Sequence, residues 1–587
     1  MIEFPPGLIL VLGALLLPFM GGVVRSAYSL LLPLATLVAV WLVPDNAHVT
    51  VPFMGDMEMT LLQWNPPTRV FATIFSLMAF GGALFSLNQN RRVELPAAFV
   101  YAGSAICVTF AGDILSLFIF WEMMAVGSTI VVWCGNTEAS GRAGLRYAAV
   151  HFVGGAVLMA GILAHVFALQ SGGVQSPLGL EYFAFGPAGF DALSFNGPSD
   201  IAPWLILIGI LINAATPPFG SWLADAYPEA SESGTVFLSA FTTKTAVYVL
   251  MVLFAGTELL IYAGLMMAVY GIVYAILEND MRRILAYSIV NQVGFMVCGI
   301  GIGTEMALNG AAAHAFAHII YKALLLMSAG SVVYMTGKRK CTDLGGLYHT
   351  MPITMWCGII GALAISAFPW TSGFVSKSMI STAAADNHLF VAWMILTAAS
   401  AGVFLHAGIK FPWFVFFQKD SGLRPPDPPW NMKAAMLLFA GLCILIGVAY
   451  EPLYAILPFP AAAGETLYEP YTVSHVVSQL QLLLWSGLAF FLLLPVLKRT
   501  LTITLDFDWI WRSFVPWLWR GILRPLVTVL GWFRDVFFIE AKRFGAAMTR
   551  PETRENQGGF FREWSLGGAM VLLTFMLLVF LVVGFLD

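Results

Sequence analysis

Three ionisable side chains stand inside long apolar stretches, where a charge costs about 3 kcal/mol to hold in lipid. Glu122 lies in FIFWEMMAVGS, Lys244 in VFLSAFTTKTAVYVLMVLF and Lys377 in FPWTSGFVSKSMI. A buried lysine without a partner loses its proton more easily than an exposed one, and a proton relay needs this property. The alternatives are structural: Glu122 could neutralise a lysine, and the lysines could serve helix packing.

A second group of ionisable residues follows a helical spacing. In HAFAHIIYK, His314, His318 and Lys322 recur every four residues and therefore share one face of a helix. This ladder favours proton transfer over three separately satisfied core side chains. Lys322 brings positive charge and no acidic or thiol ligand is near, so the histidines are not expected to bind zinc. Lys410, in FLHAGIKFPW, either supports the relay or extends to the membrane interface.

The composition shows what must position these residues. Of 587 residues, 59% are hydrophobic and 11% are charged, against roughly 25% charged in soluble domains. Such a chain must be solvated by lipid. A net charge of −4 gives no basic field for nucleic acid. The six cysteines show no metal-ligand or disulfide spacing.

Apolar runs of about 20 residues, the length that spans a bilayer, recur along the whole chain. They predict an all-α polytopic membrane protein with about 16 transmembrane helices, and the N-terminus is interpreted as a retained first crossing rather than a signal peptide. Proline interrupts the run 202–219 near Pro217 and the run 352–386 near Pro369. Because proline lacks a backbone donor, these broken helices should lie against protein or a polar cavity.

The basic residues predict the orientation of the chain. They fall in six loops on one side when each broken run counts as a single crossing, whereas the opposite loops, including 44–68 and 171–201, hold almost none. The positive-inside rule makes the basic side cytoplasmic. We expect a multi-pass protein of the cell inner (cytoplasmic) membrane. Four acidic residues lie near that side and either gather protons or form an ordinary solvated face: Asp225, Glu229, Glu232 and Asp280.

Residues 505–550 differ in kind from the other segments. They mix Trp, Phe and Leu with several arginines, which predicts an amphipathic helix along the cytoplasmic interface, broken at Pro516 and Pro525. A last crossing follows at 565–587. The segment serves either as a membrane anchor or as a strap across a neighbouring subunit.

No nucleotide or redox site is apparent in the sequence. It contains no Walker A motif and no dinucleotide fingerprint after a strand. We therefore predict no cofactor, no metal and no active site of the chain's own. The energy for transport must come from an ion gradient or from partner subunits.

Several motifs in a fixed order resemble one known family. The chain is similar to the antiporter-like membrane subunits shared by Mrp-type Na⁺/H⁺ antiporters, respiratory complex I and membrane-bound hydrogenases, and most of all to the D-type subunits of Mrp antiporters. The motifs are GDILSLFIFWEMM (112–124), PPFGSWLADAYPEA (217–230), FTTKTAVY (241–248), ENDMRRILAYSIVNQVGF (278–295), HAFAHIIYKALLLMSAGSV (314–332), DLGGL (343–347) and FPWTSGFVSKSMI (368–380).

The resemblance implies an organisation into two inverted five-helix repeats. Its segments would be N-terminal helices at 1–110, repeats at 96–255 and 257–417, additional helices at 433–497, the lateral helix at 505–550 and the crossing at 565–587. It also implies a proton relay through Glu122, Lys244, His314, His318, Lys322 and Lys377. Asp113 matches the acidic residue that begins the glutamate helix.

The chain departs from the family pattern at one functional position. The family places a lysine, paired with the glutamate, nine residues before the tryptophan that is Trp222 here. That position is Asn213, which can hydrogen-bond Glu122 but cannot be protonated. The motif's histidines are Gly220 and Tyr227. Lys244 is the alternative partner for Glu122.

Three functions remain open at this stage. The first is a proton-translocating subunit of a multisubunit cation/proton antiporter that carries protons and a cation such as Na⁺. The second is an energy-coupling membrane subunit of a complex-I-like redox, hydrogenase or inorganic-carbon-uptake complex. The third is a related scaffold subunit that has lost transport. All three predict other membrane subunits and the lipid bilayer as partners, and none involves nucleic acid.

Overall fold

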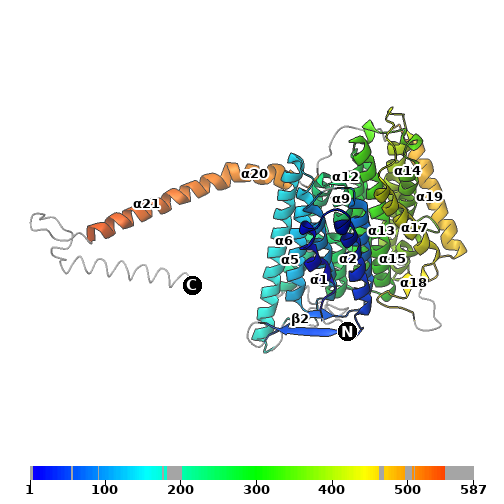
Figure 1. The fold of residues 1–587 in the computed structure, drawn as a ribbon. Coiled ribbons are helices and arrows are strands. Elements are labelled where there is room, and N and C mark those ends of the chain that lie inside the picture. The colour runs from blue at the N-terminus through cyan, green and yellow to red at the C-terminus, as the bar shows by residue number, and fades with distance from the viewer. Residues whose placement is uncertain are drawn as a thin grey trace, which may run out of the picture. The chain divides into compact units, whose positions relative to one another are not determined.

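The computed structural model describes residues 4–53, 57–89, 91–174, 178–180, 201–461, 468–495, 506–507 and 509–548. The chain forms two compact units, Met1–Phe507 and Asp508–Asp587. The predicted last crossing at 565–587 lies outside the described residues. Figure 1 shows the helices of the first unit side by side as a bundle, with the β-hairpin at one end.

The first unit is helical apart from one hairpin. Up to the first broken helix its elements are α1 Gly7–Ala14, η1 Leu17–Phe19, α2 Gly22–Leu42, β1 His48–Pro52, β2 Glu58–Gln63, α3 Thr68–Ser86, α4 Glu94–Phe110, α5 Ile114–Trp133, α6 Glu138–Ser171 and α7 Ile201–Asn213. The middle of the unit holds α8 Ser221–Ala226, η5 Tyr227–Glu229, α9 Glu232–Leu238, α10 Thr242–Leu253, α11 Leu259–Leu277, α12 Met281–Ile302 and α13 Glu305–Thr336. The remainder comprises η6 Cys341–Asp343, η7 Leu347–His349, α14 Pro352–Ile365, α15 Phe374–Asp386, α16 Phe390–Val403, η8 Phe404–Lys410, η9 Trp413–Phe417, α17 Trp430–Val448, α18 Glu451–Tyr454 and α19 Val473–Leu493.

These helices confirm the predicted class, an all-α polytopic membrane protein. Over the described ranges, 11 helices are long and apolar enough to cross a membrane, and four shorter segments are also apolar. The total of about 16 crossings, the inverted repeats and the segment boundaries stay predictions.

The helix breaks fall where the prolines predicted them. Helix α7 ends at Asn213 and α8 begins at Ser221, on either side of Pro217. Helix α14 ends at Ile365 and α15 begins at Phe374, on either side of Pro369. A third break, at 239–241 between α9 and α10, contains no proline and was not predicted.

Helix α13 lies at the centre of the bundle. It packs against α3, α9, α10, α12, α14, α15 and α17, and every residue from Ala307 to Val332 is buried. Thr304 caps its start, and Gly337 ends it in the left-handed conformation at φ +66°. A helix that is apolar all round is expected to be buried in this way. The ladder residues therefore lie in the protein interior rather than in lipid.

The predicted loop 44–68 contains a two-stranded antiparallel hairpin. Strands β1 and β2 pair from His48–Gln63 to Pro52–Glu58, with an irregularity between Val49 and Thr50. Thr60 of β2 donates its backbone N–H to the Asp113 carboxylate at 2.6 Å. The hairpin is thereby attached to the start of α5.

The second unit is described from Trp509 to Met548 and is helical, as expected. Its segments are η10 Ile510–Phe514, α20 Val515–Leu518, η11 Trp519–Leu523 and α21 Arg524–Met548. The predicted breaks at Pro516 and Pro525 were wrong. Wider i→i+5 turns precede each proline, which accommodates the missing N–H without ending the helix.

Candidate functional site

Two facing helices, α12 and α13, form the centre of the site. Lys322 Nζ donates to Ser288 Oγ at 2.9 Å and lies 3.4 Å from the Leu285 carbonyl. One turn further along α12, Gln292 Oε1 lies 3.1 Å from His314 Nε2. The ladder on α13 is thus matched by a polar face on α12.

The ladder continues to a third helix, α15. His314 Nδ1 lies 3.2 Å from Ser376 Oγ, next to Lys377 in the chain. Tyr321 also donates to Gln292 Oε1, at 3.0 Å. His318 lies with its ring centroid 6.2 Å from that of His314, and neither of its nitrogens has a hydrogen-bond partner. Both histidine rings are fully buried.

Lys244 lies at one end of this group, three residues into α10. Its Nζ donates to the Ser239 carbonyl at 2.7 Å and to Thr243 Oγ1 at 3.1 Å. The break at 239–241 explains the first contact, since a carbonyl at a helix end lacks an intrahelical partner. Helix α10 packs against α13, which carries the ladder.

Lys377 lies at the other end, just after the second break. Its Nζ is 4.5 Å from the centroid of the Phe295 ring and has no hydrogen-bond acceptor. The side chain lines a cavity of about 290 Å³ whose polar lining includes Ser381, Thr397 and His475. Lys377 is therefore in contact with a polar space on one side and near His314 on the other.

Glu122 stands apart from the lysines. It is half-buried on α5, and its Oε1 has no hydrogen-bond partner. Among the residues that the structure describes, neither Asn213 nor Lys244 bonds it, and Asn213 Oδ1 is itself buried without a partner. The carboxylate faces α6 at Gly155. The ladder and both lysines are brought together, whereas Glu122 is connected to them by no direct contact.

The sequence of this chain is similar to that of a known family. Residues 111–402 match the family described as NADH:quinone oxidoreductase/Mrp antiporter, TM. The matched stretch includes the buried lysines and histidines of the site. The resemblance predicted from the motifs is confirmed.

The relatives extend this result. The chain is 26% identical over 448 residues to the D-type Na(+)/H(+) antiporter subunit of Alkalihalophilus pseudofirmus, covering 71% of this chain and 88% of the relative. It is 28% identical over 402 residues to a probable K(+)/H(+) antiporter protein of the A/B type from Rhizobium meliloti, covering 66% of this chain but 39% of that longer relative. A chain of the Mrp complex from Dietzia sp. shares the fold with a TM-score of 0.65, at 20% identity, covering 82% of this chain and 95% of that chain.

The acidic residues next to the basic loops are ion-paired. Asp225 pairs with Arg146 at 2.7 Å, and Glu229 and Asp280 pair with Arg339 at 2.8 and 2.7 Å. Partial burial lowers the pKa of Arg339, but the Glu229 hydrogen bond and the Asp280 charge outweigh it and raise the pKa. These carboxylates do not form an ordinary solvated face, because each is paired with an arginine; a part in gathering protons stays a prediction.

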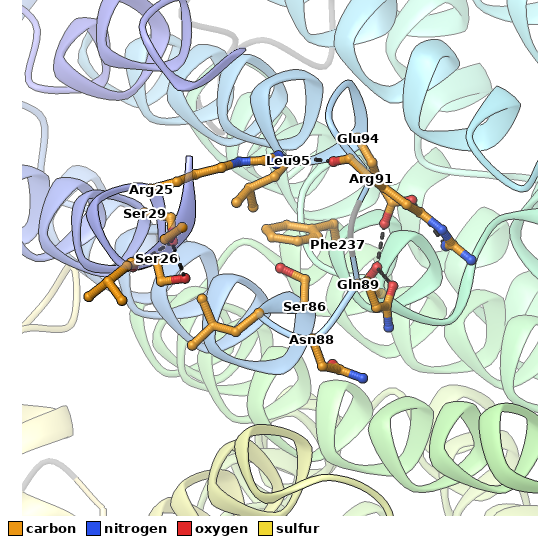
Figure 2. A pocket seen from close by; sticks show the side chains of 14 residues that line it. Arg25, Ser26, Ser29, Ser86, Asn88, Gln89, Arg91, Glu94, Leu95 and Phe237 are labelled. Atoms are coloured by element: carbon orange, nitrogen blue, oxygen red, sulfur yellow. Dashed lines mark hydrogen bonds and ion pairs between the residues drawn. The ribbon is translucent and has the colours of Figure 1, made fainter. Parts of the chain in front are cut away.

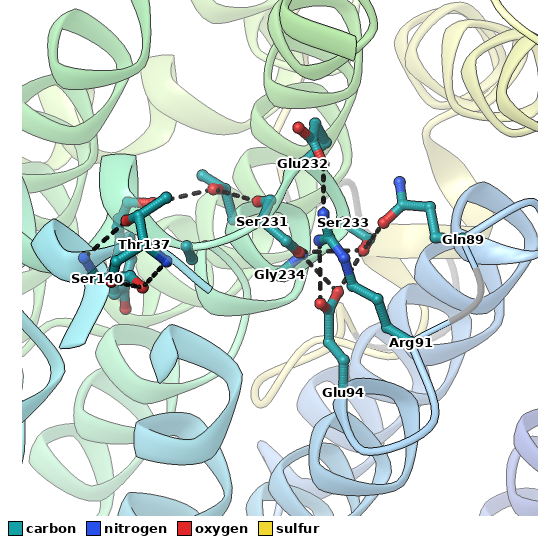
Figure 3. A network of polar contacts seen from close by, with 12 residues as sticks. Gln89, Arg91, Glu94, Thr137, Ser140, Ser231, Glu232, Ser233 and Gly234 are labelled. Carbon is teal, nitrogen blue, oxygen red and sulfur yellow. Dashed lines mark hydrogen bonds and ion pairs between the residues drawn. The ribbon is translucent and has the colours of Figure 1, made fainter. Parts of the chain in front are cut away.

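A buried carboxylate completes this ion-paired layer. Figure 3 shows Glu94 accepting hydrogen bonds from Ser231, at 2.7 Å, and from Ser233. Arg91 lies 3.1 Å from both Glu94 and Glu232. A cavity of about 440 Å³ adjoins the network and is lined by Arg25, Gln89 and other residues (Figure 2). Arg91 is thus shared between two carboxylates of this layer.

Two of the predicted supporting residues have structural contacts. Asp113 caps α5 by accepting from the Leu115 and Ser116 N–H groups, both at 2.8 Å. Lys410 does not extend to the interface. Its Nζ donates to the Ile276 and Glu278 carbonyls at 2.5 and 2.6 Å, so it satisfies the C-terminal end of α11.

Sequence reasoning missed the uncharged partners of the relay. Ser288, Gln292 and Ser376 carry no charge, so a search for ionisable residues in apolar runs does not select them. His151 and His475 are ionisable and lie in apolar runs, but they were not selected from the sequence. Their positions only become informative once the neighbouring helices are known.

Proposed function

We propose that this chain is the proton-translocating subunit of a multisubunit cation/proton antiporter. Protons would enter near Glu122, pass Lys244 and the His314–His318–Lys322 ladder, and leave near Lys377. The relatives named as Na(+)/H(+) and K(+)/H(+) antiporter subunits support a monovalent cation as the exchanged ion. Other membrane subunits of the assembly would be its partners.

One observation carries the proposal: Lys322, His318, His314 and Lys377 are all buried and follow one another through the protein interior. Ser288, Gln292 and Ser376 lie within hydrogen-bond distance of the ladder residues on three helices. Buried polar groups in such a network cost free energy unless they are satisfied, and within membrane spans they mark ion or proton pathways. A scaffold without transport gives no reason for three cationic or basic side chains to lie along one buried face.

Each of the two end lysines lies shortly after a helix break. Lys244 is the third residue of α10, after the break at 239–241. Lys377 is the fourth residue of α15, after the break at 366–373. Non-helical backbone at membrane depth is tolerated where it is buried or lines a water-filled cavity.

Charge repulsion would couple the steps. In the low-dielectric interior, two ammonium groups repel strongly, so a proton arriving on Lys244 disfavours a second on Lys322. The displaced proton moves along the histidines, whose neutral rings accept at one nitrogen and donate at the other. A cation movement in a partner subunit would set the direction.

The test uses the assembled complex in sealed vesicles. Lys244→Met and Lys377→Met keep the side-chain length but remove the titratable group, and each should lower cation-dependent proton transport by roughly 100-fold or more. Lys433→Met is the matched control, because Lys433 lies over the Trp430 ring rather than in the relay. Wild-type transport by both relay variants, in complexes that still assemble, would refute the proposal.

The family description also names NADH:quinone oxidoreductase, which favours a second candidate. In that case, the same relay would couple proton flow to redox, hydrogenase or carbon-uptake chemistry on partner subunits. A mild-detergent pull-down of the tagged chain with mass spectrometry separates the two. Several small hydrophobic subunits support the antiporter, whereas redox, hydrogenase or carbonic-anhydrase-like subunits support the second candidate.

A further inference from the structure

Three buried polar atoms without hydrogen-bond partners surround one short stretch of α6. They are Glu122 Oε1 on α5, His151 Nε2 on α6 and Asn213 Oδ1 at the end of α7. His151 is 2% exposed and Asn213 is 1% exposed. Most buried polar groups in proteins have partners, so three orphans in one place call for an explanation.

The backbone places these groups around Gly154 and Gly155. A Cβ on Gly155 would lie 2.9 Å from the Glu122 Cδ and 3.2 Å from its Oε2, so the carboxylate rests against this glycine. A Cβ on Gly154 would lie 3.1 Å from the Ile212 side chain, next to Asn213. His151 is one turn before Gly155 and therefore on the same face of α6.

The imidazole of His151 is held in one orientation. Its ring stacks on Tyr147 with centroids 3.9 Å apart and meets the edge of Trp222 at 4.5 Å. Its Nδ1 lies 2.9 Å from the Tyr147 carbonyl. A carbonyl can only accept, so Nδ1 carries the hydrogen and Nε2 presents the basic lone pair.

On its other side, His151 adjoins hydroxyl groups that extend to Lys244. Tyr147 OH donates to Ser128 Oγ at 2.9 Å and lies 3.5 Å from Thr242 Oγ1. Thr242 Oγ1 is 2.6 Å from Tyr101 OH. The next residue, Thr243, accepts from Lys244 Nζ. The buried hydroxyl contacts thus extend from α6 to Thr242, two residues before Lys244 in the chain.

We propose that His151 carries protons between Glu122 and Lys244, the task that Asn213 cannot perform. This inference rests on the proposed function. Nε2 takes a proton from the Glu122 carboxyl, which leaves a carboxylate, and the proton departs when that same Nε2–H bond breaks, because Nδ1–H faces a carbonyl that cannot accept it. The Tyr147 hydroxyl takes this proton and releases its own hydrogen to Thr242 Oγ1, which in turn releases one toward the neutral Lys244 amine. In each transfer one O–H or N–H bond breaks and another forms, so no co-reactant is needed. Two further tyrosines lie beside these groups: Tyr101 OH at Thr242 Oγ1, and Tyr227 against Trp222 with ring centroids 5.8 Å apart.

The experiment measures proton transport by the assembled complex in vesicles. His151→Gln keeps a donor for the Tyr147 carbonyl but cannot be protonated, and it should lower transport about tenfold or more without loss of assembly. His48→Gln, in the exposed hairpin, is the matched control. Adding Asn213→Lys to His151→Gln places a titratable group beside Glu122 and should restore transport to within about threefold of wild type.

Each other outcome has a definite meaning. Wild-type transport by His151→Gln overturns the role of His151. A loss that Asn213→Lys does not restore assigns His151 to packing and overturns it as well. The Lys244→Met and Lys377→Met variants are measured in parallel, because wild-type transport by those two would refute the proposed function itself rather than this inference alone.

Discussion

Adding one methyl group at Gly155 should displace the Glu122 carboxylate without removing any charge from the protein. In Gly155→Ala the new Cβ would lie 2.9 Å from Cδ and 3.2 Å from Oε2 of Glu122, and it would collide with Oε1. Since the backbone of α6 is packed between α5 and α7, the flexible glutamate side chain must move. The substitution therefore tests the position of Glu122 separately from its presence.

The size of the effect can be estimated from packing. Forcing an extra methyl group into a packed interior costs about 1–3 kcal/mol. If that free energy shifts the equilibrium from correctly placed to displaced Glu122 carboxylates, proton transport should fall roughly 5- to 150-fold. Gly141→Ala on the same helix is the matched control, because nothing lies within 4 Å of its Cβ. There, an alanine should raise stability by about 0.5–1 kcal/mol and leave transport unchanged.

The assay is proton uptake into vesicles that contain the complex, normalised to assembled protein. Transport at the wild-type rate by an assembled Gly155→Ala complex would show that the Glu122 position is not critical. It would refute the idea that the relay needs the carboxylate in its place against Gly155. A reduced rate in Gly141→Ala would instead show that α6 tolerates no added methyl group, and the comparison would carry no information about Glu122.

Three further predictions concern contacts seen in the structure. Gln292→Leu removes the acceptor shared by His314 and Tyr321 and should lower transport about tenfold in vesicles, whereas assembly at the wild-type level is expected by co-purification. Lys410→Met leaves the α11 carbonyls unsatisfied and should lower the thermal midpoint of the purified complex, as expected for a loss of about 1–3 kcal/mol; a loss of transport per assembled complex would contradict its structural role. Arg91→Leu leaves the buried Glu94 without its cation and should destabilise the protein by about 3–5 kcal/mol in a thermal or denaturant assay; an unchanged midpoint would show that the serines alone satisfy Glu94.

Part of this architecture could be predicted from patterns within short stretches of the sequence. The four-residue spacing of His314, His318 and Lys322 predicted one helical face, and α13 presents them in that way. Proline predicted the breaks before α8 and α15, because the lost donor interrupts the helix locally. Periodicity and composition report on the segment in which they occur, so these features could be predicted from the sequence.

Contacts between distant segments could not be predicted. The role of Lys410 depends on the end of α11, about 130 residues earlier in the chain. The acidic residues near the basic loops looked solvated or proton-gathering, and only the structure shows that they pair with arginines. The break at 239–241 has no proline and gave no signal. At Pro516 and Pro525 the helix accommodates the ring by widening, an outcome that depends on several turns at once.

The uninterrupted course of α13 has a consequence for how such a relay could be gated. Amide hydrogens from Ala307 to Val332 are buried and helical, so they should exchange with deuterium only during the largest openings of the protein. Amides at the two breaks, such as Ala240, Ala367 and Thr371, bond to the carbonyl three residues earlier rather than in the regular helical pattern, and they should exchange sooner. Fluctuations on the timescale of turnover would then be concentrated beside Lys244 and Lys377. The ladder residues on α13 would then hold their positions during turnover. The helix breaks beside Lys244 and Lys377 would be the places where proton entry and exit are controlled.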